Sequence, residues 1–291
     1  MNKVAIVADS TISMPLEVAM KHGIAVIPFH VIMDGKSHLD IEVDREQLYA
    51  QLREKGNLPT TSGYTAEECL RVYQELSQRA EAILQISMTS AFTAMGYNAA
   101  MKAKEIARGK LPNTTIEVID SQAVGPALTL VVLEAAEAAA QGKSLREVAE
   151  IASSVISRVN ELEGSDTLFY LDKGGRIFQA KSWVEAQAKN SFRTIVEIDT
   201  SVGGLTKPVA RAKTKTQIME KMVDIAKERV GNKKLHAAIA HTNVPDQAEQ
   251  LREMVLSRFQ CDELYVNEAS APTAVHNGEG LIEFGFYGSE E

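Results

Sequence analysis

Short apolar runs alternate with amphipathic stretches along the first 160 or so residues of the chain. Residues 4–8 form a continuous apolar run, which is typical of a strand buried on both faces. The same pattern predicts further strands at 24–32, 82–87 and 115–119, and helices at 15–21, 45–55, 66–80, 91–108, 126–141 and 145–160. Such alternation indicates an α/β fold built on a mainly parallel sheet with flanking helices.

The pattern changes in the second half of the chain. Strands are expected at 167–171, 194–199, 205–210, 236–240, 263–266 and 281–286, and helices at 216–230 and 245–258. Gly203 and Gly204 separate two of these strands and predict a hairpin. Hairpins mixed with helical crossovers favour a mixed or antiparallel sheet that carries helices. We therefore expect an N-terminal α/β domain at 1–162 and a C-terminal α/β domain at 163–291.

Four threonine and serine hydroxyls lie within six residues at Thr60, Thr61, Ser62 and Thr65, just before an expected helix. Thr65 can cap this helix, and Glu68 three residues later completes a capping box. The remaining hydroxyls, together with free amides near a helix start, suit a carboxylate or phosphate. From this segment alone, a turn with a cap and an anion site are equally open.

Polar residues also follow the other expected strands of the first half. Asp9 and Ser10 follow the first strand, 87–93 follows another, and Asp120 and Ser121 end a third. Parallel sheets bind ligands at the carboxyl ends of their strands, so we expect these segments to lie together.

Charge and composition narrow the classes of partner. The 31 basic and 39 acidic residues give a net charge of -8, which disfavours nucleic acid and anionic membranes. Cys69 and Cys261 are far apart and are expected to be ordinary core thiols. Residues 1–9 read as a strand rather than a signal peptide, and the longest apolar run, 123–133, is too short to span a bilayer. A cytoplasmic protein without stable membrane insertion is expected.

Standard catalytic and nucleotide-binding motifs are missing from the sequence, and its six histidines have no spacing that favours a metal. His276 stands in a glycine-bearing segment before the final strand, read as a loop. It is either a surface residue in a turn or a hydrogen-bond donor to an anion. Residues 173–176 pair two glycines with Lys173 and Arg176. They form either a plain hairpin turn or a site for an anionic group or partner.

The order of these motifs resembles that of the DegV family of bacterial fatty acid-binding proteins, over essentially the whole chain. The most specific stretch is 170–177, Tyr-Leu-Asp-Lys-Gly-Gly-Arg-Ile. The matching residues are Asp9-Ser10-Thr11 with Pro15, Asp34-Gly35 with Asp40 and Tyr49, Thr60-Thr61-Ser62, Ile86-Ser87 with Thr93, Asp120-Ser121, 169–177 and His276-Asn277-Gly278.

The resemblance implies a two-domain protein that encloses one long-chain fatty acid between its domains. Thr61, with Ser62 beside it, and His276 would bind the carboxylate. Ala91 falls where the family has a carboxylate-binding serine, so Ser90 or nearby amides would replace that contact. The secondary candidates for the site are Asp9, Ser10, Thr93 and Arg176.

The resemblance also implies a carrier rather than an enzyme, with no catalytic residue, metal or cofactor. Such a carrier presents the fatty acid carboxyl to a separate fatty acid kinase. Lys213 stands where many family members have an arginine on the surface that meets the kinase. A monomer is expected.

Two other functions stay open at this point. One is an enzyme, a hydrolase or phosphotransferase on a small acyl or phosphorylated substrate, with Asp9, Ser10 and His276 as acid, base or nucleophile. The other is a regulatory protein that responds to a bound lipid.

Overall fold

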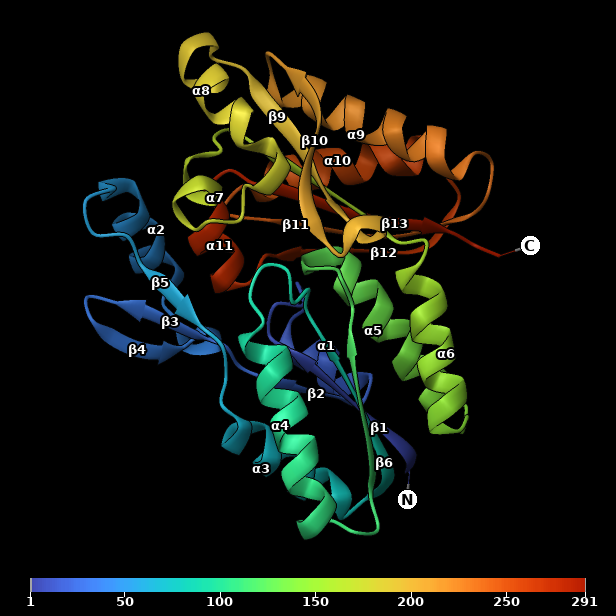
Figure 1. Ribbon diagram of the computed structural model, residues 1–291. Helices are drawn as coiled ribbons and strands as arrows, with labels where there is room; N and C mark the ends of the chain where they lie inside the picture. Colours follow the sequence, from blue (N-terminus) through green and yellow to red (C-terminus); the bar gives the residue numbers. More distant parts are fainter. Residues whose placement is uncertain (1, 291) are drawn as a thin grey trace.

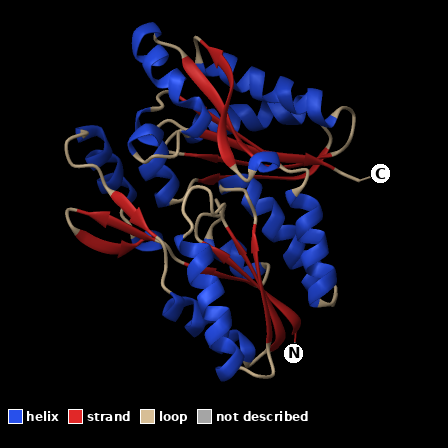
Figure 2. Ribbon diagram, viewed as in Figure 1, coloured by secondary structure: helices blue, strands red, loops and turns tan. Residues whose placement is uncertain are grey.

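The computed structural model describes residues 2–290, which form three β-sheets with helices around them (Figures 1 and 2). The first sheet has the order β2-β1-β6-β7, and all its strand pairs are parallel. Its strands are β1 Asn2–Asp9, β2 Ile24–Ile27, β6 Ala80–Ser87 and β7 Thr115–Asp120. The predicted parallel sheet is confirmed.

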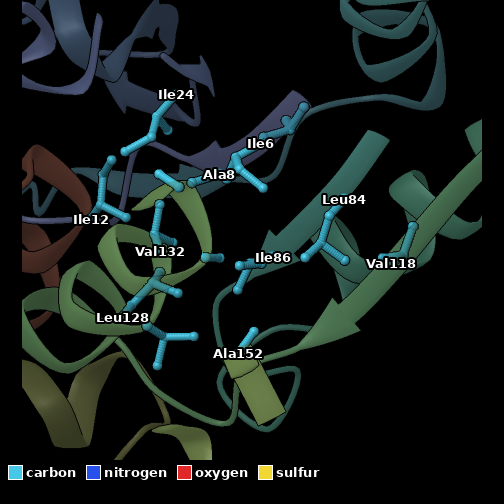
Figure 3. Packing of buried hydrophobic residues seen from close by; sticks show 14 of the residues in the cluster. Ile6, Ala8, Ile12, Ile24, Leu84, Ile86, Val118, Leu128, Val132 and Ala152 are labelled. Atoms are coloured by element: carbon cyan, nitrogen blue, oxygen red, sulfur yellow. The ribbon is translucent and has the colours of Figure 1, made fainter. Parts of the chain in front are cut away.

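Helices cover both sides of this sheet (Figure 1). Those of the first half are α1 Leu16–Lys21, α2 Arg45–Glu54, α3 Ala66–Ser77, α4 Met95–Lys110, α5 Gly125–Ala140 and α6 Leu145–Ile156. Figure 3 shows Ile6 of β1 and Ile86 of β6 close to Leu128 and Val132 of α5, all four buried. Helix α5 is apolar almost all round because it packs on α6, on β1 and on three strands of the second half.

A small antiparallel sheet, β4-β3-β5, stands to one side with α2 (Figure 1). Its strands are β3 His30–Met33, β4 Lys36–Leu39 and β5 Thr60–Ser62, and the 3-10 helix η1 Asp40–Glu42 follows β4. The prediction of one strand over 24–32 is wrong, because the chain leaves the first sheet at Pro28, which has no N–H for a ladder. The segment 60–62 is a strand rather than a loop.

The third sheet has six strands in the order β10-β9-β8-β13-β11-β12. Only the β11–β12 pair is parallel, which confirms the predicted mixed sheet. Its strands are β8 Asn160–Ser165, β9 Arg193–Asp199, β10 Leu205–Ala212, β11 Leu235–His241, β12 Cys261–Glu268 and β13 Ile282–Gly288. The other elements here are α7 Phe169–Lys173, η2 Phe178–Ala180, α8 Lys181–Asn190, η3 Thr200–Val202, α9 Lys215–Val230, α10 Pro245–Arg258 and α11 Ala271–Asn277.

Several predicted elements are corrected. The predicted strand at 167–171 is wrong, since Phe169–Lys173 is helix α7 and the strand lies earlier, in β8. A short apolar run does not by itself distinguish strand from helix. The helix predicted at 145–160 ends at Ile156, the one predicted from residue 91 begins at Met95, and α8 was not predicted.

The two halves share part of their core. Ile198, Ala238 and Tyr287 of the six-stranded sheet pack in the same apolar cluster as the first sheet. The expected boundary at 162/163 falls within β8, whose residues 160–165 pair with β9 and β13. A division into two domains stays a prediction.

No helix among residues 2–290 combines the length and apolar character that a membrane crossing needs.

Candidate ligand-binding site

A cavity lies where loops at the strand ends of the first sheet meet the elements of the second half. The cavity itself measures about 40 Å³, and it continues into a wider hollow of about 460 Å³ that includes open solvent. Its walls come from both halves of the chain and consist of Thr11, Phe29, Thr61, Met88, Phe92, Thr93, Val124, Glu163, Arg176, Pro272, Thr273, His276, Asn277 and Glu283. Loops after β1, β6 and β7 contribute, as the rule for parallel sheets predicts.

Thr61 and His276, 215 residues apart in sequence, meet at this cavity. Strand β5 places Thr61, and the last turn of α11, not a loop, places His276. Thr61 Oγ1 lies 2.8 Å from His276 Nε2 in a hydrogen bond. Burial lowers the pKa of His276 to about 3, and the nearby positive charge of Arg176 adds to the shift. The imidazole is therefore neutral at pH 7, with one N–H to donate.

Two glycines allow α7 and α11 to pack closely enough to position this histidine. A Cβ on Gly174 would lie 2.5 Å from His276 Nδ1. Gly278 has φ +77, and a Cβ there would overlap the ring of Tyr170. The paired glycines at 174–175 therefore belong to a helix end and not to a hairpin turn, because Gly174 is the C-cap of α7.

Arg176 lines the cavity near His276. Its Nη1 donates to the Gly174 carbonyl, and its side chain is partly buried. Burial lowers the pKa of its guanidinium, and none of the ion pairs within residues 2–290 involves it. A partly desolvated cation without a carboxylate partner suits an anionic ligand group.

Of the other predicted site residues, some line the cavity and some lie outside its walls. Thr93 lines the cavity, whereas Ser62 and Ser90 do not. The Ser62 hydroxyl donates to the Gly63 carbonyl at 3.3 Å, and the Ser90 amide donates to the Asp120 carboxylate at 3.2 Å. The carboxylate-binding roles of Thr61, Ser62, Ser90 and His276 stay predictions.

Asp9 and Ser10 hold the loops behind the cavity. Asp9 accepts hydrogen bonds from the backbone amides of Thr11 at 3.1 Å and Met88 at 2.8 Å. Its burial raises its pKa to about 6 in spite of these bonds. Ser10 Oγ accepts a bond from the Phe29 amide at 2.9 Å. Thr11, Met88 and Phe29 all line the cavity, so these two polar residues fix its wall.

Sequence reasoning missed most of the lining. Phe29, Met88, Phe92 and Val124 are apolar residues that carry no signal to separate a cavity wall from an ordinary core. Glu283 did carry one, because it is a charge inside the apolar strand expected at 281–286, whereas Glu163 lies in β8, which was not predicted. The His, Cys, Asp and Glu side chains of the described part of the chain form no group suited to a metal ion.

Known proteins resemble this chain over nearly its full length. Residues 3–288 match the family model described as "Uncharacterised protein, DegV family". A DegV domain-containing protein of Clostridium perfringens is 28% identical over 277 residues, which cover 94% of this chain and 95% of the relative.

Solved structures share the fold. A DegV family protein from Thermus thermophilus, reported for its fatty acid binding, superposes with a TM-score of 0.90 at 25% identity, covering 99% of this chain and 100% of that one. DegV of Bacillus subtilis, reported as a fatty acid binding protein, superposes with a TM-score of 0.86 at 22% identity, with the same coverage. The second likeness shows the fold alone.

Proposed function

Because the chain belongs to the DegV family, we propose that it is a carrier that binds one long-chain fatty acid in the cavity between its two halves. The observation that carries this proposal is that the Thr61–His276 hydrogen bond and Arg176, which makes no ion pair with the described residues, lie in one cavity with a partly apolar wall. The related protein of Thermus thermophilus is reported to bind fatty acid and supports the same ligand class.

The apolar part of the cavity would supply most of the affinity. Phe29, Met88, Phe92 and Val124 offer an apolar surface to an acyl chain. Each methylene removed from water contributes about 0.8 kcal/mol, so about a dozen give on the order of 10 kcal/mol. Association offsets roughly 4–15 kcal/mol of this gain. The headgroup contacts then decide orientation.

The carboxylate would lie at the Thr61, His276 and Arg176 end. A buried carboxylate needs several donors, since an unpaired one is strongly disfavoured. The guanidinium of Arg176 supplies several N–H donors. The hydrogen-bonded pair of Thr61 and His276 supplies one more, from whichever of the two does not give its proton to the other. Ser62 and Ser90 would contribute only after a local rearrangement.

The carrier would present this carboxyl to a separate fatty acid kinase. Lys213 follows β10 with an exposed side chain and marks the surface we propose for that contact. The protein alone would then show no turnover, and it would act in the cytoplasm as a monomer.

Extraction is the direct test of the ligand class. We expect mass spectrometry of an organic extract from the purified protein to show one long-chain acyl group per chain. We expect a delipidated sample to take up added palmitic acid in a titration. Absence of both would refute the carrier.

The headgroup is tested by two threonine variants from the same segment. Thr61→Val removes a hydroxyl that bonds His276 and takes part in binding the carboxylate. A hydrogen bond to a charged carboxylate is worth about 1.5–3 kcal/mol, so we expect Kd to rise roughly 10–100-fold. Thr65→Ala is the control, because Thr65 caps α3 in a capping box with Glu68. It should lower stability by about 1 kcal/mol and leave Kd unchanged. Equal affinity of Thr61→Val and wild type would exclude Thr61 from the site.

A further inference from the structure

The wall of the cavity formed by β8 and β13 carries acidic side chains. Glu163 and Glu283 lie directly opposite each other in the antiparallel register, so their side chains share one face of the sheet. Both line the cavity. Glu161 lies two residues along β8 on the same face. All three are at most 1% exposed.

These carboxyls lack the partners that buried carboxyls normally have. Both oxygens of Glu283, Oε2 of Glu163 and Oε1 of Glu161 make no hydrogen bond with the described protein atoms. The other oxygen of Glu161 accepts from the Ala127 amide at 2.6 Å, at the start of α5. The Ser13 hydroxyl is close enough to Glu283 to oppose the rise of its pKa, but it also lacks a partner with normal geometry. No ion pair of the described residues includes the three.

Burial keeps these groups protonated near neutral pH. It raises the pKa of Glu163 to about 8, and it raises those of Glu161 and Glu283 well above their ordinary value, with the neighbouring carboxyls adding to the shift. A protonated carboxyl both donates and accepts a hydrogen bond. The neutral carboxyls of Glu163 and Glu283 can therefore donate a hydrogen bond to each other or to a polar group of a ligand in the cavity.

The main chain is adapted to this arrangement. Gly125 has φ +44, and a Cβ there would lie 2.7 Å from Glu283 Oε1. Apolar side chains at 163 and 283 would pack without leaving polar atoms unsatisfied, so packing alone does not account for the acids.

We propose that Glu163 and Glu283 form a second polar site in the cavity, and that the preferred ligand is an acyl chain carrying a hydroxyl group in addition to its carboxylate. This inference rests on the proposed carrier function and restricts the class of fatty acid that the carrier prefers. The two polar sites lie on different elements, since Thr61 belongs to β5 and His276 to α11, whereas Glu163 and Glu283 belong to β8 and β13. A hydroxyl matches neutral carboxyls, since it also donates and accepts. A ligand ammonium would require a carboxylate to ionise in apolar surroundings.

The test compares the affinities of palmitic acid and of a set of hydroxypalmitic acids that differ in the hydroxyl position. For the wild-type protein, we expect at least one hydroxy acid to bind roughly tenfold tighter than palmitic acid. If palmitic acid binds as tightly as every hydroxy acid, this inference is overturned and the carrier function stands. If none of the acids binds, the carrier function itself fails.

Two variants at one position separate hydrogen bonding from charge. Glu283→Met removes the polar group at similar length and should abolish the preference while keeping palmitic acid binding. Glu283→Gln keeps a neutral donor and acceptor and should retain the preference. A preference that survives Glu283→Met, or disappears in Glu283→Gln, would overturn the hydroxyl assignment.

Thr61→Val serves as a matched control at the other end of the cavity. It should weaken both kinds of acid by the same factor and leave their ratio unchanged. A changed ratio would place the hydroxyl at the Thr61 end and overturn the proposal. Thermal unfolding of each variant checks folding, and we expect Glu283→Met to unfold at the same temperature as wild type or higher, because it removes unsatisfied polar atoms.

Discussion

Burial determines the charge state of single residues around the cavity. His276 is neutral because it is desolvated and lies near Arg176, while Glu163 is protonated because it is desolvated among carboxyls. Arg176 keeps its charge, because a guanidinium stays protonated even when its pKa falls. The ligand-free cavity therefore has one cation and neutral polar groups on its walls, which is a suitable setting for one anionic headgroup.

The titration of His276 should respond to that headgroup. Without ligand, we expect its ring to stay neutral down to about pH 4, since its pKa lies near 3. A bound carboxylate next to the ring favours the imidazolium, so the pKa should rise in the complex. NMR of the histidine rings with and without palmitic acid measures both pKa values of His276. An identical His276 titration in the two states would place the carboxylate elsewhere.

At the scale of elements, the contact between α7 and α11 leaves little room for a side chain at its glycines. Gly174 ends α7 with an ordinary φ of -76, so the obstacles to a side chain there are steric: His276 Nδ1 would lie 2.5 Å from a Cβ and the Tyr170 carbonyl oxygen 3.2 Å from it. Gly175 is the reverse case, because its φ is +74 but no atom lies within 4 Å of a Cβ there. Gly174 is therefore required because a side chain would collide with its neighbours, whereas Gly175 is required for its left-handed backbone conformation.

We expect Gly174→Ala to impair binding and Gly175→Ala to impair stability. The alanine at 174 displaces His276 from Thr61, and the loss of that bond should weaken palmitic acid binding about tenfold or more. The alanine at 175 should cost about 1–2 kcal/mol of stability through its left-handed backbone and leave Kd unchanged. Titration and thermal unfolding of both variants are the measurements. Equal affinities of the two variants would show that His276 does not need this packing.

Sequence patterns predicted those elements that local chemistry determines. Thr65 was expected to cap a helix with Glu68, and the capping box is present. The parallel strands were found from their continuous apolar runs. The strand β8 was missed because Glu161 and Glu163 interrupt its pattern, and the break at Pro28 was overlooked inside an apolar run. Both failures occur where tertiary context, rather than local propensity, selects the structure.

For the whole molecule, the sequence predicted the family and part of the site. The collinear motifs pointed to Thr61 and His276, which the fold brings together across 215 residues. It could not show that Ser62 and Ser90 lie outside the cavity walls, because side-chain direction depends on strand pairing and turn geometry. Nor could it identify the apolar lining, which is indistinguishable by residue type from the core.

The buried acids should also shape the pH dependence of the whole fold. Glu163 has its pKa raised from 4.5 to about 8, so the folded state holds its proton where the unfolded chain releases it. The contribution of Glu163 to the free energy of unfolding is fully present below pH 4.5 and is lost as the pH rises toward 8. The pKa values of Asp9 and Asp40 are raised to about 6. These two groups therefore change the stability of the fold at lower pH, between their ordinary pKa and pH 6. The interval between pH 6 and 8 therefore reports on the acids of β8 and β13, together with His241 and His276. The lowered pKa values of these histidines act in the opposite direction near their ordinary value of 6.5.

We expect Glu163→Gln to flatten the decline in unfolding temperature between pH 6 and 8. The amide cannot ionise, and its neutrality also removes one carboxyl that raises the pKa of Glu283. For a chain of this size, each kcal/mol gained in the free energy of unfolding raises the unfolding temperature by about 2–4 °C. Glu150→Gln, at an exposed side chain of α6, is the control and should leave the profile unchanged. Parallel profiles for wild type and Glu163→Gln would mean that Glu163 ionises as readily in the folded protein as in the unfolded chain. The carboxyls of the cavity wall would then be hydrated anions, and a hydroxylated chain would have no advantage there.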